Sequence, residues 1–316
     1  MKRRFLVLGN GGFGTALALH LSSLGHEVRL WGNDAAYTQV IATTRTNPRY
    51  LQGFEVPAAI EVGSDLVALA RDAERVLAVV PTQHLRSVAT RFASALAGKV
   101  IVSCSKGLEE ATARLPSEIL ADCIEDPQLF VLAGADRATL EALQAEVSGP
   151  NLRIYRSPDR LGAELGAALK NVIAIAAGIG DGLGLGDNAK SALLTRGLAE
   201  IARFGVALGA DRETFYGLAG LGDLITTSVS PHGRNRRLGE AIGRGAALDE
   251  VLARTQQVAE GVWTCRAVLR QAMELGVAMP ITEAVAAVLF DGKDPRQATT
   301  ELMTRLLREE AEAQDA

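Results

Sequence analysis

A glycine-rich turn near the N-terminus constrains the fold of this chain more than any other stretch. The apolar run Phe5–Leu8 ends at Gly9, and an Ala- and Leu-rich helical pattern begins at once after Gly14. In the pattern G-x-G-x-x-G, Gly9 permits a tight turn, Gly11 lets the backbone approach a phosphate, and Gly14 lets the helix pack against the strand. The residues therefore predict a strand, a turn and a helix whose N-terminal N–H groups bind a pyrophosphate.

A second strand is expected directly after this helix. The helical pattern ends near Gly25, and Glu27-Val-Arg-Leu-Trp31 has the composition of a strand. A glycine-rich turn that binds nothing is the alternative, and the complete β-α-β context disfavours it. The stretch therefore predicts a dinucleotide site at the carboxyl ends of parallel strands.

The residues after the second strand leave both NAD and NADP open as the cofactor. An acidic side chain directly at the strand end favours NAD, because it bonds the ribose 2′-hydroxyl and repels a 2′-phosphate. Trp31 and Asn33 occupy this region, and Asp34 lies just past it. Arg45 and Arg49 can reach a 2′-phosphate, although a solvated arginine is the simpler interpretation of either.

Length, charge and cysteine content narrow the class of protein. A chain of 316 residues suits two domains, and a net charge of −4 argues against a broad surface for nucleic acid or anionic membrane. The three cysteines lie far apart without a C-x-x-C pair, which is typical of reduced intracellular thiols rather than a zinc site. The longest later apolar stretch, around 172–179, is too short to span a bilayer. We therefore expect a cytoplasmic protein without a membrane span.

Apolar strands and amphipathic helices alternate along the first half of the chain. We expect strands at 75–80, 99–105, 129–133 and 152–155, a loop over 47–56, a short helix capped by Ser64, and helices over 83–96 and 136–147. This alternation predicts a parallel sheet covered on both faces. From Pro158 onward helices follow one another, so we expect a first domain over 1–157 and a second over 158–316.

Two clusters of polar residues in the helical half are candidates for catalysis and substrate binding. Lys170 and Asn171 are the polar exceptions in the apolar helix 161–178. A lysine there either extends to solvent or is held partly desolvated with a lowered pKa, and the sequence favours neither. The second cluster, Arg234-Asn-Arg-Arg237, follows Gly233 and suits a phosphate, because guanidinium groups bond phosphate oxygens in pairs. A solvated basic helix face is the alternative.

Several motifs, in a fixed order over nearly the whole chain, resemble those of the bacterial NAD(P)-dependent glycerol-3-phosphate dehydrogenases. The motifs are the glycine turn at 9–18, Leu30-Trp-Gly-Asn-Asp, Val79-Val-Pro-Thr, Ser105-Lys-Gly-Leu-Glu, Leu169-Lys-Asn-Val-Ile-Ala-Ile, Leu194-Thr-Arg-Gly-Leu-Ala-Glu, Gly217-Leu-Ala-Gly-Leu-Gly-Asp-Leu, Arg234-Asn-Arg-Arg, Val258-Ala-Glu-Gly and Met279-Pro-Ile-Thr-Glu. The resemblance implies an α/β fold with a Rossmann-type, doubly wound, mostly parallel sheet, followed by an all-α helical domain that binds substrate.

The implied reaction is the reversible reduction of dihydroxyacetone phosphate to sn-glycerol 3-phosphate with NAD(P)H, which feeds glycerophospholipid synthesis. The family resemblance is also compatible with a homodimer. It places the catalytic lysine at Lys170, a second substrate-binding lysine at Lys106 and a substrate-binding aspartate at Asp223. The phosphate-binding run falls on Gly233, Arg234 and Asn235. Cofactor contacts fall on the turn glycines Gly9, Gly11 and Gly14 and on Gly12, Phe13, Asn33, Lys106, Arg234, Val258 and Glu260.

The chemistry of these residue types fits the implied reaction. When a hydride reaches a carbonyl carbon, the oxygen becomes an alkoxide that needs positive charge and a proton. Lys170 can supply that proton and take it back in the oxidative direction, while Lys106 adds positive charge. Arg234 would hold the phosphate and thereby position the reacting carbon. Asp223 either orients Lys170 or bonds a glycerol hydroxyl, and no metal is required.

The chain departs from the family pattern after Leu132. Family members continue with a Ser-Gly-Pro-x-Phe-Ala-x-Glu segment, a helix, a Pro-Thr-Ala turn and another strand. Here Phe130-Val-Leu-Ala-Gly-Ala-Asp136 joins the first strand to the end of the later one, and Gly134 is the nearest counterpart of the lost contacts. The missing segment makes a weakly active or non-catalytic dinucleotide-binding relative one alternative. A dehydrogenase for another small hydroxy acid is the other, because the same two-domain plan serves several dehydrogenases.

Overall fold

The computed structural model of the chain describes residues 2–130, 133–134, 136–254 and 259–305, which form two compact units. The first unit comprises Met1–Ser105 and Pro116–Arg160, and the second comprises Lys106–Leu115 and Leu161–Ala316. The boundary expected near Ser157 therefore lies three residues later. No pattern in the sequence indicates that residues 106–115 belong with the helical half.

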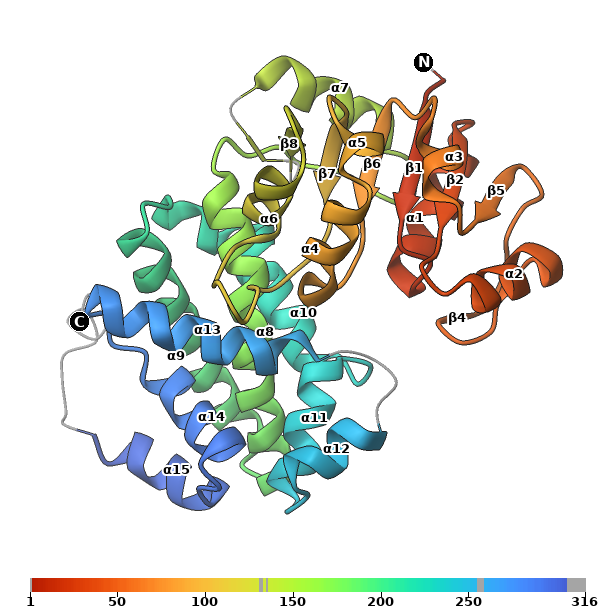
Figure 1. Cartoon of the computed structure of the whole chain (residues 1–316). Coiled ribbons are helices and arrows are strands. Elements are labelled where there is room, and N and C mark those ends of the chain that lie inside the picture. Colours follow the sequence, from red (N-terminus) through yellow and green to blue (C-terminus); the bar gives the residue numbers. More distant parts are fainter. Residues whose placement is uncertain (1, 131–132, 135, 255–258, 306–316) are drawn as a thin grey trace. The chain divides into compact units, whose positions relative to one another are not determined.

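A six-stranded sheet forms the centre of the first unit. Its strands are β1 (Arg4–Leu8), β2 (Glu27–Trp31), β5 (Ile60–Gly63), β6 (Arg75–Ala78), β7 (Val100–Ser103) and β8 (Gln128–Phe130). They lie in the order β5-β2-β1-β6-β7-β8, and every neighbouring pair is parallel (Figure 1). The strand order reverses direction between β1 and β6, which makes the sheet doubly wound and confirms the predicted fold class.

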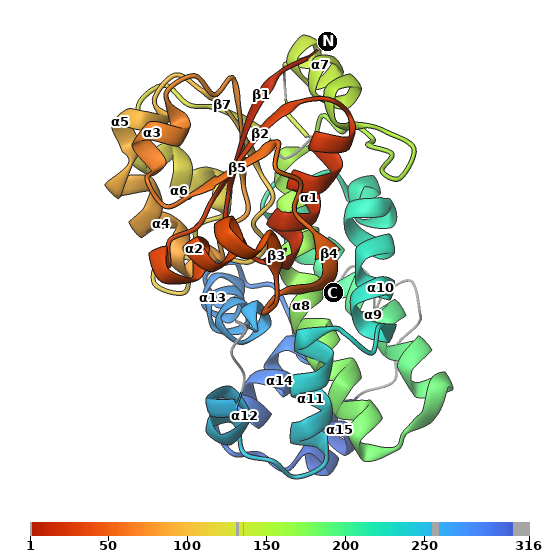
Figure 2. The same ribbon diagram turned by 90° about the vertical axis from the view of Figure 1, so that its right-hand side faces the viewer.

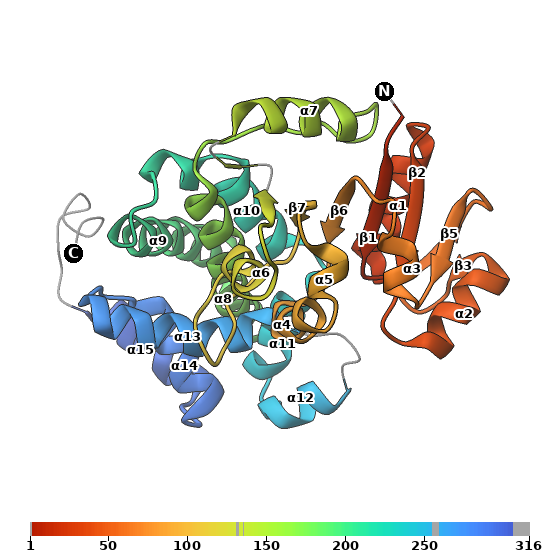
Figure 3. The ribbon, with the colours of Figure 1, turned by 45° about the horizontal axis from the view of Figure 1, so that its top comes forward.

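Helices pack on both faces of this sheet. They are α1 (Gly12–Ser23), α2 (Ala35–Thr44), α3 (Leu66–Ala70), α4 (Thr82–Arg91), α5 (Ala93–Leu96), α6 (Pro116–Cys123) and α7 (Arg137–Val147). Phe5 and Val7 of β1 belong to an apolar cluster with α1, α2 and α7, whereas Leu6 and Leu8 belong to a second cluster with α3, α4, α5 and α6. The alternation of side chains along β1 thus gives the sheet a core on each face. Figure 3 shows α7 on one side of the strands and α4, α5 and α6 on the other.

Most expected elements of the first unit are present, with local differences. The loop expected over 47–56 is wrong, because β3 (Thr46–Asn47) pairs antiparallel with β4 (Leu51–Glu55) in mostly exposed residues without an apolar pattern (Figure 2). Asp65, not Ser64, caps α3, since its carboxylate accepts from the N–H of Ala68. The expected strand over 152–155 is also wrong: within this described stretch only an isolated bridge joins Gly149 to Leu152.

The second unit is built from helices. They are α8 (Arg160–Leu183), α9 (Gly186–Ala207), the 3-10 helix η1 (Arg212–Tyr216), the π-helical turn η2 (Leu218–Gly222), α10 (Asp223–Val229), α11 (Arg234–Gly243), α12 (Leu248–Arg254), α13 (Glu260–Leu275), α14 (Pro280–Phe290) and α15 (Pro295–Met303). Among the described helices, α8 is the one that is long and apolar enough to meet the criteria for a membrane span. However, 89% of its apolar window is buried inside the protein, as expected for the core helix of a packed unit.

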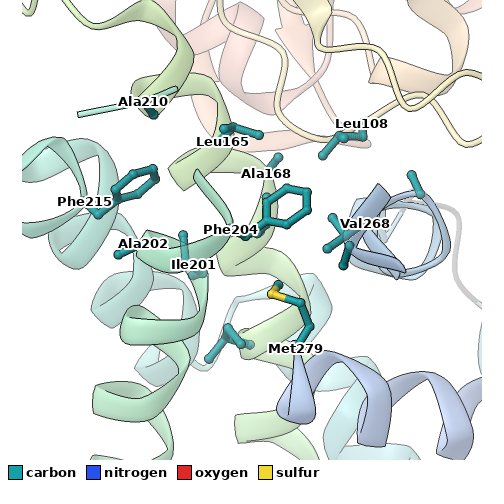
Figure 4. Packing of buried hydrophobic residues seen from close by; sticks show 14 of the residues in the cluster. Leu108, Leu165, Ala168, Ile201, Ala202, Phe204, Ala210, Phe215, Val268 and Met279 are labelled. Carbon is teal, nitrogen blue, oxygen red and sulfur yellow. The ribbon is translucent and has the colours of Figure 1, made fainter. Parts of the chain in front are cut away.

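The apolar core of the second unit also explains why residues 106–115 belong to it. Leu108 lies in a cluster with Leu165 of α8, Phe204 of α9 and Val268 of α13 (Figure 4). The N–H of Leu108 also donates to the hydroxyl of Thr264 on α13 at 3.4 Å. Burial of a large apolar side chain contributes roughly 1.5–3 kcal/mol, so this contact anchors the segment.

Glycines let α11 lie directly against α8. A Cβ atom at Gly178 would lie 2.0 Å from the carbonyl oxygen of Arg236, and one at Gly239 would lie 2.1 Å from that of Ile175. Backbone atoms cannot yield to such a contact as a flexible side chain can. The glycine contact therefore fixes the position of the α11 N-terminus relative to α8.

Candidate functional site

The predicted glycine turn of the first unit forms between β1 and α1. Gly9 has a φ of +121°, which favours glycine. A Cβ at Gly9 would lie 2.6 Å from the carbonyl oxygen of Val79, and one at Gly14 would lie 1.8 Å from that of Gly9. A Cβ at Gly12 would lie 2.7 Å from the carbonyl oxygen of Tyr50. These three positions require glycine because other backbone approaches them closely.

Gly11 differs because the space beside it is open. Apart from its chain neighbours, no described atom lies within 4 Å of a Cβ built there, and no described side chain caps the start of α1. The first turn of α1 contains no acidic residue, and Phe13 is 56% exposed. The N–H groups of this turn thus line an open cradle that a Cβ would fill, and the residues present fit the pyrophosphate of a dinucleotide.

A buried asparagine behind the turn was not predicted from the sequence. The side-chain amide of Asn47 donates to the carbonyl oxygen of Asn10 at 2.9 Å and to the hydroxyl of Thr15 at 2.7 Å. Its Oδ1 accepts from the hydroxyl of Tyr37 at 2.5 Å and from the N–H of Tyr50 at 3.1 Å. Asn47 is 0% exposed and ties the β3–β4 hairpin to the glycine turn. A lone asparagine in a polar stretch gives no sequence signal of this role.

The residues considered for cofactor recognition at and after the end of β2 differ in what their side chains contact. Trp31 is buried and donates its ring N–H to the carbonyl oxygen of Ser64 at 3.0 Å. Arg45 donates to the carbonyl oxygens of Val56 and Ile60 at 3.0 and 2.8 Å. These contacts commit Trp31 and Arg45 to structure, whereas Asn33 is exposed at the end of β2.

A cluster of two lysines and one aspartate lies in the second unit. The Nζ of Lys170 lies 2.5 Å from Oδ1 of Asp223, and the Nζ of Lys106 donates to Oδ2 of the same carboxylate at 2.8 Å. Lys170 also donates to the hydroxyl of Thr227 at 2.6 Å. Asp223 and Thr227 are one turn apart on α10 and present one face to Lys170 of α8. The predicted residues Lys106, Lys170 and Asp223 are thus brought together.

The charges of this cluster are strongly coupled. Lys170 is 4% exposed, and its burial, together with the positive charge of Lys106, lowers the pKa of Lys170 to about 8 although Asp223 acts in the opposite direction. Burial by itself would raise the pKa of Asp223, but Lys106 and Lys170 together hold that pKa below its usual value. The cluster therefore contains a lysine that can exchange a proton near neutral pH, next to an ionised carboxylate.

Close backbone packing sets the position of Asp223. A Cβ at Gly166 of α8 would lie 2.9 Å from the carbonyl oxygen of Ala219, and one at Gly220 would lie 2.1 Å from that of Phe215. The π-helical turn η2 therefore packs directly on α8 and ends at Asp223. Single π turns inside helical segments frequently occur at functional sites.

The start of α11 lies beside the lysine cluster. A Cβ at Gly233, the N-cap of α11, would lie 2.8 Å from the carbonyl oxygen of Thr227, whose hydroxyl bonds Lys170. No described side chain caps this helix. Arg234 is exposed, and the buried Asn235 accepts from the N–H of Gly261 at 3.1 Å. An exposed arginine and uncapped N–H groups next to a proton-exchanging lysine suit a phosphorylated substrate.

Another predicted residue, Glu260, is next in sequence to a contact of this helix start. Glu260 is buried and precedes Gly261, which bonds Asn235. Val258 lies outside the described residues. Arg236 is committed to a structural pair, since its guanidinium lies 2.6 Å from the carboxylate of Asp181.

The described part of the chain holds no group of three or more His, Cys, Asp or Glu side chains that could bind a metal ion. Cys104, Cys123 and Cys265 form no disulfide bond. The glycine cradle on a doubly wound sheet, together with a helical unit carrying a desolvated lysine, is typical of the two-domain dehydrogenases that use a nicotinamide dinucleotide.

Comparison with known proteins narrows this class to one family. The profile described as NAD-dependent glycerol-3-phosphate dehydrogenase N-terminus matches residues 5–148, and the profile described as its C-terminus matches residues 159–300. The chain belongs to the NAD-dependent glycerol-3-phosphate dehydrogenase family. It is 46% identical to the glycerol-3-phosphate dehydrogenase [NAD(P)+] of Geobacillus thermodenitrificans, with 96% of this chain and 95% of the relative covered. For the enzyme of Streptomyces coelicolor the identity is 44%, with 96% and 97% covered.

A solved structure agrees with this assignment. The crystal structure of glycerol-3-phosphate dehydrogenase from Coxiella burnetii has a TM-score of 0.90 and 33% identity to this chain, with 96% of this chain and 99% of the other covered. The alignment with the Geobacillus relative spans 327 positions, more than the 316 residues present here, so it contains gaps on this chain's side. Such gaps agree with a shortened segment, although residues 131, 132 and 135 of the expected junction lie outside the described residues.

Proposed function

We propose that this chain catalyses the reversible reduction of dihydroxyacetone phosphate to sn-glycerol 3-phosphate with NADH or NADPH, a reaction that supplies glycerophospholipid synthesis. The main support is that Lys170 and Lys106 both contact the carboxylate of Asp223. Burial and the charge of Lys106 lower the pKa of Lys170 to about 8. Membership of the glycerol-3-phosphate dehydrogenase family supports this assignment over a non-catalytic dinucleotide-binding relative.

The second unit is proposed as the substrate-binding domain. Lys170 would give its proton to the carbonyl oxygen during reduction and accept it from the hydroxyl during oxidation. Lys106 would stabilise the developing negative charge on that oxygen. Asp223 already contacts both ammonium groups, which supports a role in orienting Lys170. General acid catalysis of this kind contributes typically about 10²–10⁴ in rate.

The start of α11 is proposed as the phosphate site. Gly233, Arg234 and Asn235 form the first residues of this helix, and Arg234 is the exposed guanidinium among them. A phosphate held there would fix the distance from the carbonyl carbon to Lys170. The exposed arginine and the uncapped N–H groups provide one anion site, which suits the phosphate of the substrate. Family membership supports a phosphorylated substrate over another small hydroxy acid, because an arginine also binds a carboxylate.

The first unit is proposed as the dinucleotide-binding domain. The turn residues Gly9, Gly11, Gly12, Phe13 and Gly14 would hold the pyrophosphate through backbone N–H groups. The bound dinucleotide supplies or accepts the hydride. By family resemblance Lys106, Arg234, Val258 and Glu260 would add further contacts to it.

We further propose that the protein works in the cytoplasm as a homodimer. The three free thiols support a reducing compartment. Light scattering on the purified chain tests the dimer, and a mass of one chain at all concentrations contradicts it.

Oxidation of NADH or NADPH by the purified chain in the presence of dihydroxyacetone phosphate tests the reaction. We expect Lys170→Ala to lower kcat by about 10²–10⁴ with little change in substrate KM. At saturating cofactor, Arg234→Ala should raise the KM for dihydroxyacetone phosphate and have a much smaller effect on the slow turnover of unphosphorylated dihydroxyacetone.

Arg237→Ala is the matched control for Arg234→Ala, because Arg237 is an exposed arginine three residues further along the same helix. Equal effects of the two substitutions would indicate a general electrostatic contribution and contradict the phosphate site. A wild-type chain that reduces both substrates equally well would contradict the proposed substrate.

A further inference from the structure

Asp34 and Arg49 lie together at the carboxyl end of β2. Asp34 is the twentieth residue after Gly14 in the chain, the spacing at which an acidic residue of such folds meets the adenosine ribose. Its Oδ1 accepts from the N–H of Tyr37 at 3.0 Å and caps α2. Its Oδ2 lies 4.0 Å from the guanidinium of Arg49. One carboxylate oxygen is thus fixed by the helix and the other faces an arginine.

Aromatic rings hold Arg49 in place without burying it. Its guanidinium carbon lies 4.2 Å from the ring centre of Tyr37, and its backbone N–H donates to the hydroxyl of the same tyrosine at 3.0 Å. The side chain of Arg49 is 44% exposed and that of Asp34 is 58% exposed. Both charged groups are therefore accessible to a ligand at the strand end. Arg45, in contrast, is committed to backbone carbonyl oxygens.

A carboxylate and a guanidinium, which have opposite preferences for the 2′-position of the adenosine ribose, lie next to each other at the end of β2. A carboxylate at this position bonds the 2′-hydroxyl of NAD and repels the 2′-phosphate of NADP. An arginine accepts the 2′-phosphate through paired hydrogen bonds. The two charged groups are 4.0 Å apart, which is longer than a hydrogen bond, and the contact of Arg49 with the ring of Tyr37 does not depend on Asp34.

We propose that the Asp34–Arg49 pair decides cofactor preference and allows this chain to accept both dinucleotides, with Asp34 receiving the ribose 2′-hydroxyl and Arg49 receiving the 2′-phosphate. This proposal rests on the dinucleotide binding of the proposed function and goes beyond it by assigning the discriminating residues. Arg49 offsets the charge of Asp34, so that the carboxylate does not exclude the phosphorylated form. Tyr37 is a positioning residue, because it holds Arg49 over the strand end.

Calorimetric titration of the full chain with two nicotinamide-free fragments tests the pair independently of turnover. The probes are adenosine 5′-monophosphate and adenosine 2′,5′-bisphosphate, which differ only in the 2′-phosphate. Arg49→Met should weaken the bisphosphate at least about tenfold and leave the monophosphate within about twofold. Asp34→Asn keeps an oxygen to cap α2 and should tighten the bisphosphate by severalfold, because the repelling charge is gone.

Arg91→Met is the matched control, since Arg91 also stacks on an aromatic ring, 4.9 Å from the centre of Phe92, in the same unit. The control should leave the ratio of the two affinities unchanged. If Arg49→Met leaves that ratio unchanged, or weakens both fragments equally, the assignment of Arg49 is overturned while the dinucleotide site stands. If the wild-type chain binds neither fragment and does not bind NADH, the proposed dinucleotide site itself fails, and the assignment with it.

Discussion

At the scale of single residues, burial decides what Lys170 can do. Its sequence context allowed either a lysine that extends to solvent or one that is partly desolvated. In the structure Lys170 is desolvated, with 4% of its surface exposed. A desolvated ammonium group loses hydration, and the nearby Lys106 repels it, so the neutral form gains relative to the charged form. A lysine with an ordinary pKa would stay charged through the neutral range and could not serve as a base.

We predict opposite pH dependences for the two directions of catalysis. Below about pH 8 Lys170 is an ammonium group and can donate, so kcat for reduction should fall as the pH rises through about 8. The neutral amine is needed for oxidation, so kcat for oxidation should rise over the same range. Steady-state kinetics in both directions across this range measure the two breaks, and breaks in the same direction would contradict the assignment.

Substitution of the neighbours should move that break in opposite directions. Asp223→Asn removes a charge that raises the pKa of Lys170, so the break should move to lower pH. Lys106→Met removes a charge that lowers the pKa, so the break should move to higher pH. A shift of both variants in one direction would show that another group controls the profile.

At the scale of elements, the contact of α8 with α11 depends on glycines. We predict that Gly178→Ala destabilises the protein by about 1–3 kcal/mol, because its Cβ would lie 2.0 Å from the carbonyl oxygen of Arg236. Gly180→Ala, on the same helix, should be neutral or stabilising by up to about 1 kcal/mol, since the nearest atom to its Cβ is 3.8 Å away. Urea unfolding of the two variants measures the difference. Equal stability would contradict the close contact.

The elements also show which parts of this fold a sequence pattern can predict. The doubly wound sheet and the central helix were predictable, because strands such as β1 and β7 are continuous apolar runs and α8 is apolar over most of its length. The hairpin of β3 and β4 was not, because its residues are mostly polar and exposed. The bend that sends residues 106–115 to the helical unit depends on the burial of Leu108, which periodicity cannot reveal.

The candidate site likewise contains residues that the sequence predicted and one, Asn47, that it did not. The spacing of the glycines predicted the turn, and the family resemblance implied the roles of Lys106, Lys170 and Asp223. The structure brings these three residues together. Asn47 was missed, because its role depends on hydrogen bonds to Asn10 and Thr15, which are 37 and 32 positions away in sequence. Long-range polar contacts of this kind leave no periodic signal, so only coordinates identify them.

At the scale of the whole molecule, the two kinds of site belong to different compact units. The glycine cradle at Gly11 is formed entirely by residues of the first unit, whereas Lys170 and its partners belong to the second. Substitutions at residues that share no partners usually act independently. Dinucleotide binding and proton exchange should therefore be separable by single substitutions.

We predict that Gly11→Val lowers NADH affinity, whereas Lys170→Ala lowers kcat and leaves NADH affinity nearly unchanged. The valine side chain would fill open space where a pyrophosphate binds, so NADH affinity should fall at least about tenfold while the melting temperature without ligand changes little. Lys170→Ala should leave NADH affinity within about twofold and lower kcat by about 10²–10⁴. Fluorescence titration of NADH and single-turnover kinetics on the full chain separate the two effects. If Lys170→Ala abolished NADH binding, or Gly11→Val left it intact, the division of chemistry between the units would be wrong.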